Sequence, residues 1–385
     1  MTEKLYHADS MMQTFDAQVV SCAPINHTDT YAVVLNHTAF YPEGGGQAFD
    51  TGTLGSACVS AVHEQNDVIL HTVSSPLAVG TTVQGTIDWP QRFARMQNHS
   101  GEHIVSGIVN SRHGLDNAGF HMGRDVMTID FSGVLDSAAL ADIERRANDA
   151  VYANLPLQTH TPSPAKLADM PYRSKKALSG NVRIVSIDGI DACACCGTHV
   201  THTGAIGLIK LLGAERHKGG TRVELLCGAD AYADYCRKHE GTLAVSRLLS
   251  AKPSETPQAV QALLDTERRL TEQLVDLRRR IVSLLAAQTE IHNDTAIVFT
   301  DSQFLEADDA RRLCTQLSER AKAALVCTGS DETGYRYMLI SANATELAGK
   351  LNTQFNGRGG GKPPMAQGQL HGTRAVIEAF WLGLH

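Results

Sequence analysis

His99 and His103, in the stretch NHSGEH, are residues whose types and spacing suggest chemistry. Four residues is about one helical turn, so a helix would place both imidazole rings on one face, where they could share a metal. With Glu102 beside the second histidine, HSGEH also fits the H-x-x-E-H pattern of inverted zinc proteases, in which the glutamate is the general base. The remaining ligands decide between these two interpretations.

A second pair follows in DACACCGTHVTHTGAIG, where Cys195 and His199 are again four residues apart. One thiolate and three imidazoles form a donor set that suits tetrahedral zinc. The chain contains 17 histidines, so a single H-x-x-x-H could arise by chance, but two such pairs favour a metal site. The spacing to His199 selects Cys195 as the thiolate, with Cys196 as the alternative.

Composition indicates an ordinary globular protein. The 385 residues are 43 % hydrophobic and 19 % charged, and no apolar run is long enough to cross a bilayer. Nine cysteines do not indicate a disulfide framework, and the first residues lack signal-peptide features, so we expect a reducing cytoplasm. The net charge of −7 excludes a uniformly basic nucleic-acid binder but permits local basic clusters, such as Lys210, Arg216, Lys218 and Arg222.

The elements that position these residues are predicted to form an α+β chain of four domains. Alternating stretches in residues 1–90 indicate a small β-barrel or sandwich, of which we expect the barrel. Residues 91–228 mix helices and strands around both ligand pairs, beginning with a helix over 91–112. Residues 229–290 are helical, with seven-residue spacing that is typical of a coiled coil or helical hairpin, serving either as a spacer or for dimerisation (Leu263, Leu270, Leu277 and Leu284).

Residues 291–385 are predicted to form a compact α/β module. Strands are expected at 296–300, 324–330 and 335–344, with a helix at 310–325 between the first two. A glycine loop, GRGGGKPPMAQGQ, is expected at 357–369 before a final helix at 373–384.

Four motifs in order, YPEGGGQAFDTG, RFARMQNHSGEHIV, CCGTHVTHTGAIGLIK and GTRVELLCG, resemble the editing domain of alanyl-tRNA synthetase and, still more, the free-standing AlaX trans-editing proteins. The likeness covers residues 30–228, and GRGGGKPPMAQGQ resembles the DHHA1 module of the long AlaX type. It implies hydrolysis of serine or glycine wrongly esterified to tRNA(Ala), with one Zn²⁺ per chain held by His99, His103, Cys195 and His199. A thiolate ligand argues against the protease, which leaves a non-catalytic tRNA-binding or regulatory protein with a relic zinc site as the alternative.

The resemblance also implies which residues surround the substrate. Gly44, Gly45, Gly46 and Gln47 are expected to form a wall of the pocket, where backbone N–H groups can approach a ligand. His121, in GFHMG, stands where family members commonly show Thr or Gln that reads the serine hydroxyl. Gln47 and His121 are therefore the expected catalytic residues.

Other residues receive secondary roles in this hypothesis. Arg222 is assigned to substrate binding, whereas Glu102 is expected to be a surface carboxylate or to lie behind the ligands, dispensable for deacylation. The C-terminal module is expected to bind tRNA or to form a homodimer. Its GRGGGK stretch could contact phosphate through its amides, Arg358 and Lys362, or could be a structural loop.

Overall fold

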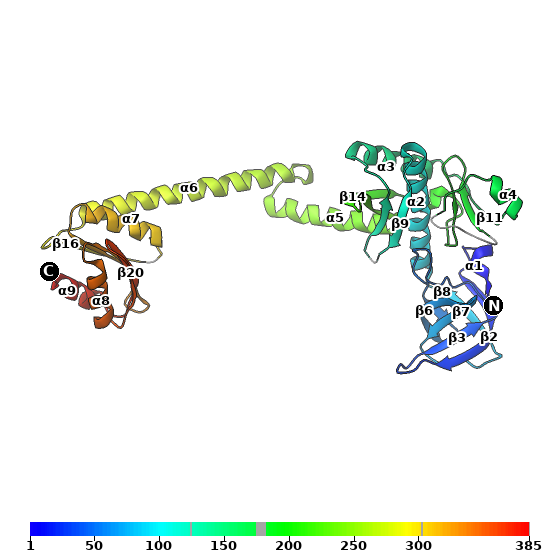
Figure 1. Ribbon diagram of the computed structural model, residues 1–385, viewed down its shortest axis with the longest axis horizontal. Helices are drawn as coiled ribbons and strands as arrows, with labels where there is room; N and C mark the ends of the chain where they lie inside the picture. Colours follow the sequence, from blue (N-terminus) through cyan, green and yellow to red (C-terminus); the bar gives the residue numbers. More distant parts are fainter. Residues whose placement is uncertain (124, 175–181, 302, 385) are drawn as a thin grey trace. The chain divides into compact units, whose positions relative to one another are not determined.

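The computed structural model describes residues 1–385 except 124, 175–181, 302 and 385. The chain is of the α+β class, as predicted, and divides into two compact units, Met1–Thr242 and Leu243–His385 (Figure 1). None of the described helices combines the length and the apolar character needed to cross a bilayer.

The first strands of unit one pair in a closed ring, in the order β2-β3-β7-β6-β5-β8. Alternate residues of these strands point inward and are buried, for example Phe15, Ala17 and Val19 of β2, which gives the barrel its apolar core. Short elements β1 (Glu3–Lys4), α1 (Leu5–Ala8) and β4 (His37–Thr38) lie at its edge, where β1 pairs parallel to β4. The ring strands are β2 (Thr14–Pro24), β3 (Tyr31–Leu35), β5 (Gly52–Leu54), β6 (Ala57–Gln65), β7 (Val68–Val73) and β8 (Thr82–Ile87).

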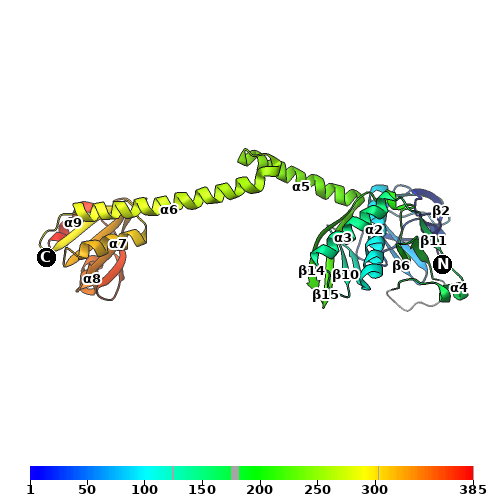
Figure 2. The same cartoon turned by 90° about the horizontal axis from the view of Figure 1, so that it is seen from above.

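Helix α2 (Trp89–His113) follows the barrel and is the central element of the rest of unit one. Its apolar residues pack against a four-stranded sheet in the order β14-β15-β10-β9, with α3 (Ser137–Tyr152) beside it (Figure 2). The sheet strands are β9 (Asn117–Met122), β10 (Met127–Phe131), β14 (Ile209–His217) and β15 (Gly220–Cys227). A second sheet, β11-β12-β13, lies near η1 (Thr203–Ile206) and α4 (Pro164–Asp169); its strands are Leu157–His160, Ile184–Ile187 and Asp191–Ala194.

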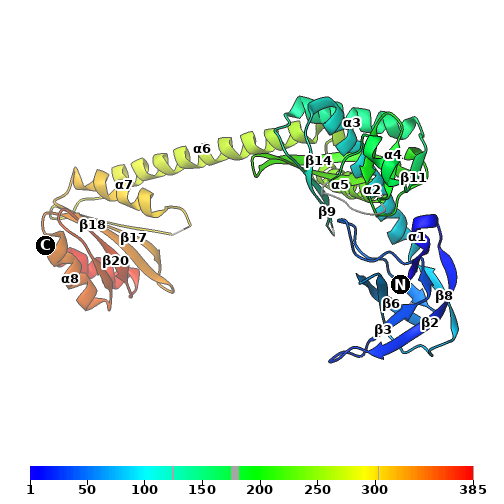
Figure 3. The same cartoon turned by 45° about the vertical axis from the view of Figure 1, so that its right-hand side comes forward.

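Helix α5 (Gly228–Leu249) runs across the boundary between the units and is followed by η2 (Pro253–Glu255) and the long helix α6 (Thr256–Gln288). Unit two then forms a sheet in the order β16-β17-β18-β20-β19, with α7 (Ala307–Ser318) on one face and α8 (Ala344–Gln354) and α9 (Arg374–Leu382) on the other (Figure 3). The strands are Thr295–Thr300, Ala323–Ser330, Gly334–Ser341, Met365–Leu370 and Arg358–Gly360.

Two sequence predictions for this unit were wrong. The helix expected at 310–325 ends at Ser318, because residues from Ala323 onward pair with β16 and β18. The stretch 357–369 is not only a glycine loop, since it contains β19 and most of β20. Glycine removes the side chains from these strands without preventing the ladder, so the local signal indicated a loop where the sheet edge forms.

Candidate metal centre

Helix α2 carries the first two predicted ligands. The helix begins where the Asp88 carboxylate accepts a hydrogen bond from the Gln91 backbone N–H, with Pro90 in the first turn, and ends at Gly114 in the left-handed conformation. Its middle is almost wholly buried, and residues His99 and His103 are each 2 % exposed. The helix therefore holds both imidazoles in the interior of unit one.

The other pair comes from the segment that follows β13. The Cys195 Sγ lies 3.5 Å from the His99 Nε2 and 3.4 Å from the His199 Nε2. Potential ligand atoms of His99, His103, Cys195 and His199 all lie within 4.8 Å of one another. The structure thus brings the four predicted ligands together, and Cys195 rather than the exposed Cys196 joins them.

The Nδ1 atom of each histidine hydrogen-bonds to a fixed acceptor. His103 Nδ1 lies 3.0 Å from the Asp191 Oδ2, His99 Nδ1 lies 2.8 Å from the Gln47 Oε1, and His199 Nδ1 lies 3.1 Å from the Ser100 Oγ. With its proton on Nδ1, each histidine would offer its Nε2 lone pair to a metal, and such contacts to the remote nitrogen orient metal-binding histidines in general.

These acceptors are themselves held in place. Arg173 donates two hydrogen bonds to the Asp191 carboxylate, at 2.7 and 2.9 Å. Gln47 accepts from the Thr198 backbone N–H through Oε1 and donates to the Thr198 hydroxyl through Nε2. The Ser100 hydroxyl accepts from the backbone N–H of Val200. Each imidazole is therefore oriented through groups that have few alternative positions.

Gly197 is required at its position by the close approach of the ligand segment to His99. A Cβ atom there would lie 2.1 Å from the His99 Cε1 and 2.4 Å from its Nδ1, distances that side chains do not tolerate. On the other side of the ring, Phe120 stacks on His99 with centroids 5.3 Å apart. Arg183 fixes the same segment by donating from Nη1 to the carbonyl oxygens of Cys195 and Gly197.

The electrostatics also suit a metal. Burial alone would raise the pKa of the Cys195 thiol, but His99, His199 and His103 hold it well below its usual value. This lowered pKa favours the thiolate, the form that binds metals. Burial lowers the pKa of His199 to about 3, so that its imidazole stays neutral. By contrast, burial raises the pKa of Cys196, which is the less suitable thiol.

Two sequence families match parts of the chain. The threonyl and alanyl tRNA synthetase second additional domain matches residues 182–224, and the family of class II (A) tRNA synthetases matches residues 2–91. The alanyl-tRNA editing protein Aarsd1 of Danio rerio is 29 % identical over 400 residues, which cover 97 % of this chain and 95 % of that protein. The Bos taurus Aarsd1 is 30 % identical over 298 residues, 72 % of this chain and 66 % of the relative.

The chain is homologous to the alanyl-tRNA editing proteins. It is also similar to the alanine–tRNA ligase of Pyrococcus abyssi, at 29 % identity over 403 residues, but it spans only 43 % of that enzyme. The additional-domain match contains Cys195 and His199, whereas His99 and His103 lie between the two matched segments. The assignment of His99 and His103 as ligands therefore depends on the geometry of the structure and not on a family match.

Within this alanyl-tRNA editing homologue, the glycine loop lies beside the centre. The backbone N–H of Gly44 donates a hydrogen bond to the carbonyl oxygen of Gln47, and the N–H of Gln47 donates to that of Gly44. Gly45 and Gly46, between them, have φ angles of +59° and +86° and form a two-residue hairpin turn. A Cβ on Gly46 would lie 2.5 Å from the Phe120 ring. Gln47 is buried and its amide is used on His99 and Thr198, so it positions a ligand and does not offer a free group to a substrate.

The structure does not bring His121 and Arg222 to the metal centre. Successive residues of a strand point to opposite faces, and Phe120, not His121, faces His99. His121 is exposed on the other face of the sheet. Arg222 shares that face and donates two hydrogen bonds to the Asp130 carboxylate, at 2.7 and 2.8 Å. Neither side chain joins the cluster.

Glu102 is buried, so of the two positions expected for it, at the surface or behind the ligands, the structure shows the second. Its Oε1 accepts hydrogen bonds from the Ser106 hydroxyl at 2.8 Å and from the Asn117 amide. Its Oε2 lies 3.8 Å from the His103 Nε2. The carboxylate is therefore part of the surroundings of the centre.

The sequence analysis missed Asp191 and Arg173, which the structure places beside the centre. Asp191 begins strand β13, four residues before Cys195, and the two-residue period of a strand gives Asp191 and Cys193 the same face, with Cys195 next after the strand. That alternation is a signal that could have placed Asp191 on the ligand side. Arg173 has no comparable signal, because it reaches the centre from a segment before β12.

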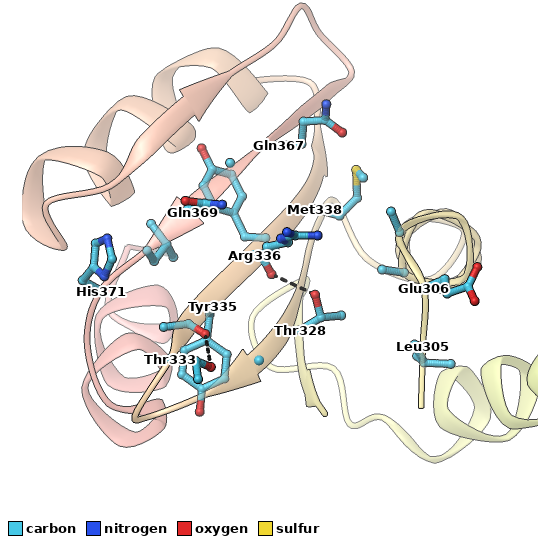
Figure 4. A pocket seen from close by; sticks show the side chains of 17 residues that line it. Leu305, Glu306, Thr328, Thr333, Tyr335, Arg336, Met338, Gln367, Gln369 and His371 are labelled. Atoms are coloured by element: carbon cyan, nitrogen blue, oxygen red, sulfur yellow. Dashed lines mark hydrogen bonds between the residues drawn. The ribbon is translucent and has the colours of Figure 1, made fainter. Parts of the chain in front are cut away.

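A separate hollow of about 1020 Å³ lies in unit two, on the sheet between α7 and β20. Arg336, Gln367 and Gln369 project from the strands that line it (Figure 4). Arg336 and Arg358 both face Gln369 across the ladder, so the three side chains share one face. Neither guanidinium forms an ion pair with any residue in the described part of the chain.

Proposed function

We propose that this chain is a trans-acting deacylase that hydrolyses serine or glycine from mischarged tRNA(Ala), with one Zn²⁺ held by His99, His103, Cys195 and His199. The observation that carries the proposal is the convergence of one thiolate and three imidazoles whose Nδ1 atoms are each fixed. This donor set suits zinc. The names of the relatives, alanyl-tRNA editing proteins, support the substrate.

The need for such an activity follows from the limits of side-chain recognition. A pocket that accepts alanine cannot strongly reject glycine, which lacks one methyl group, or serine, which adds a hydroxyl. Differences of this size give only ~10–200-fold discrimination. A second site that hydrolyses the wrong ester corrects the error after charging.

When bound, zinc would supply a Lewis acid that polarises an ester carbonyl or a water. The chain's own residues supply the orientation. Asp191 keeps the His103 proton on Nδ1, and Gln47 does the same for His99, so both Nε2 lone pairs point into the cluster. Phe120 covers one face of the His99 ring and limits access of bulk water there.

The decisive experiment compares deacylation of Ser-, Gly- and Ala-tRNA(Ala) by the purified protein with and without a zinc chelator. We expect hydrolysis of the serine or glycine ester, sparing of the alanine ester, and loss of activity on chelation that added zinc restores. Cys195→Ala should abolish activity, whereas Cys196→Ala, in the same segment, is the matched control and should retain it. A zinc-loaded protein that binds the tRNA but hydrolyses none of the esters would favour the non-catalytic alternative.

We further propose that unit two contributes to tRNA binding through the face that carries Arg336, Gln369 and Arg358. Two guanidinium groups without acidic partners among the described residues suit the phosphates of a nucleic acid. Lys362, in the neighbouring loop, adds a third positive charge. The local patch accounts for RNA binding by a chain whose net charge is −7.

The test is the salt dependence of tRNA binding. Arg336→Glu together with Arg358→Glu should weaken binding and reduce the slope of log K against log salt, because each lost phosphate contact removes ~0.7–0.9 from that slope. Arg311→Glu, on the exposed surface of α7, makes the matched control. An equal effect of the control, or an unchanged slope in the double variant, would contradict the assignment.

A further inference from the structure

Arg92, Arg173 and Arg183 reach the surroundings of the metal centre from different elements and differ in how their charges are balanced. Arg92, on α2, is fully buried and paired with Asp50. Arg173 donates to both oxygens of Asp191. Arg183, directly before β12, is partly buried, yet it forms no ion pair with any residue in the described part of the chain. Charges taken from water are normally paired, so the lone guanidinium of Arg183 is the exception.

The guanidinium of Arg183 uses only one of its three nitrogens. Nη1 donates to the carbonyl oxygens of Cys195 and Gly197, at 2.8 and 3.0 Å. Nε is buried and, like Nη2, has no hydrogen-bond partner among the residues that the structure describes. A buried donor without a partner is unusual in a native protein and indicates a water or a ligand. The Nε and Nη2 edge of the planar fork is the part that remains for such a ligand.

Arg183 lies on the side where the centre meets solvent. Cys195 is the one member of the four-ligand cluster that is not fully buried, and the next residue, Cys196, is exposed. The guanidinium lies close to both cysteines and to the ring of Tyr41. The Tyr41 hydroxyl donates to the carbonyl oxygen of Gly44, at 3.0 Å, so the glycine loop borders the same opening.

Neighbouring groups do not balance the charge of Arg183. Burial, and then the positive charges of Arg183 and Lys4, lower the pKa of His7 to about 4, so its imidazole is neutral at pH 7. Lys4 is already paired with Glu64, at 2.6 Å. The negative charge of a Cys195 thiolate would be neutralised by a bound metal. The opening therefore keeps one positive charge, which suits an anionic group of the ligand.

We infer that Arg183 binds the last phosphate of the tRNA, the one that joins the 3′-terminal nucleotide to the rest of the chain. This inference rests on the proposed function, in which the ester to be hydrolysed is on the ribose of that same nucleotide. Arg183 is held by the main chain of Cys195, whose sulfur is a metal ligand, so a single nucleotide can reach both. Arginine and phosphate form charge-assisted bidentate pairs.

Such a contact would position the ester without reading a base, because every tRNA has this phosphate. Arg183 then orients the end of the substrate, and the choice of tRNA(Ala) depends on other contacts. A role confined to holding the ligand segment would need only Nη1, and it would leave the phosphate irrelevant.

A thermodynamic cycle in the full-length, zinc-loaded protein separates these roles. The substrates are Ser-tRNA(Ala) with the natural last phosphodiester and with an uncharged methylphosphonate in its place. The unsubstituted protein should lose at least ~10-fold in kcat/KM on the uncharged linkage, the effect of one charge-assisted hydrogen bond. Arg183→Gln should lose as much on the natural tRNA and little more on the uncharged one, because the two changes remove the same contact.

Lys4→Gln is the matched control, since it removes a neighbouring positive charge that Glu64 already pairs, and it should respond to the linkage as the unsubstituted protein does. Chelator competition should give Arg183→Gln an unchanged zinc affinity. An equal loss in Arg183→Gln on both linkages would overturn the inference, as would a zinc affinity that falls in step with activity.

Failure of the proposed function gives a different result, because the unsubstituted protein would then hydrolyse neither substrate. The same cycle can be measured without hydrolysis, from the fluorescence anisotropy of labelled, non-acylated tRNA(Ala) that carries either linkage. Coupling between Arg183 and the phosphate in this binding cycle supports the contact, and its absence overturns the inference whether or not the ester is hydrolysed.

Discussion

Asp191→Asn tests the view that a buried ion pair sets the metal affinity of this centre. Asp191 is buried, accepts from His103 Nδ1 at 3.0 Å, and pairs with Arg173, whose side chain is 17 % exposed. The amide keeps the shape and one acceptor oxygen but loses the charge that makes the imidazole a stronger donor. Changes to such partners cost 10–100-fold in metal affinity, so we expect a loss of ~1.4–2.8 kcal/mol in zinc binding.

The same change acts on folding, and the two effects must be separated. Arg173 would lose its carboxylate, and removing one partner of a buried pair destabilises by ~3–5 kcal/mol. The partial exposure of Arg173 places the expected loss at or below the lower end of that range. Adding Arg173→Met removes the unpaired cation, so the double variant should recover stability while its zinc affinity stays low.

Two assays measure these quantities. Competition with a chromophoric chelator in metal-buffered solution gives the zinc dissociation constant, and urea denaturation of the metal-free protein gives the free energy of unfolding. The reasoning is refuted if Asp191→Asn binds zinc as tightly as the unsubstituted protein. It is also refuted if the double variant recovers affinity together with stability, because the effect would then be one of folding alone.

Three further predictions follow from individual contacts. Gly197→Ala should weaken zinc binding at least tenfold, because the added methyl displaces the His99 ring, whereas Gly241→Ala in α5, with open space around its Cβ, should not; chelator competition measures both. Glu102→Ala should lower the free energy of unfolding by ~1–3 kcal/mol, since Asn117 and Ser106 lose their buried acceptor. Burial lowers the pKa of His71 from 6.5 to about 4. Between these two pH values the unfolded chain binds a proton at His71 and the folded chain does not, so the free energy of unfolding should fall as the pH drops from 6.5 towards 4, by up to ~3 kcal/mol. Urea denaturation followed by Trp89 fluorescence in a Trp381→Phe background should show this loss, and His71→Gln should reduce it.

The cluster of four candidate ligands was predictable because its signal is local. A four-residue spacing on a helix and another next to a strand can be read without knowing how distant segments meet. Helix α2 was predicted for residues 91–112 and occupies Trp89–His113, since its start and stop signals are also local. The two pairs meet because α2 and β13 pack side by side. No local sequence pattern predicts this packing.

The substrate residues could not be predicted in the same way. His121 and Phe120 are neighbours in the sequence, and only the pairing of β9 with β10 and the position of α2 decide which of them faces His99. Arg222 was chosen for its charge, but Asp130 lies next to it on the adjacent strand and neutralises it. The burial of Glu102 was not predictable either, because Asn117, whose amide donates to it, comes from another element.

The three histidines differ in what their Nδ1 atoms contact, and this difference ranks them as ligands. His103 donates to a carboxylate that an arginine holds, His99 to an amide oxygen, and His199 to a hydroxyl. A negatively charged acceptor raises the basicity of the imidazole most, and a neutral hydroxyl least. We therefore expect His103 to be the strongest nitrogen donor to a bound metal and His199 the weakest. A centre with four tight protein ligands resembles a structural zinc site, whereas a catalytic one needs an open position. The graded acceptors predict that His199 would be the ligand held least firmly, so in a catalytic centre His199, rather than either histidine of α2, would give up its position to substrate or water.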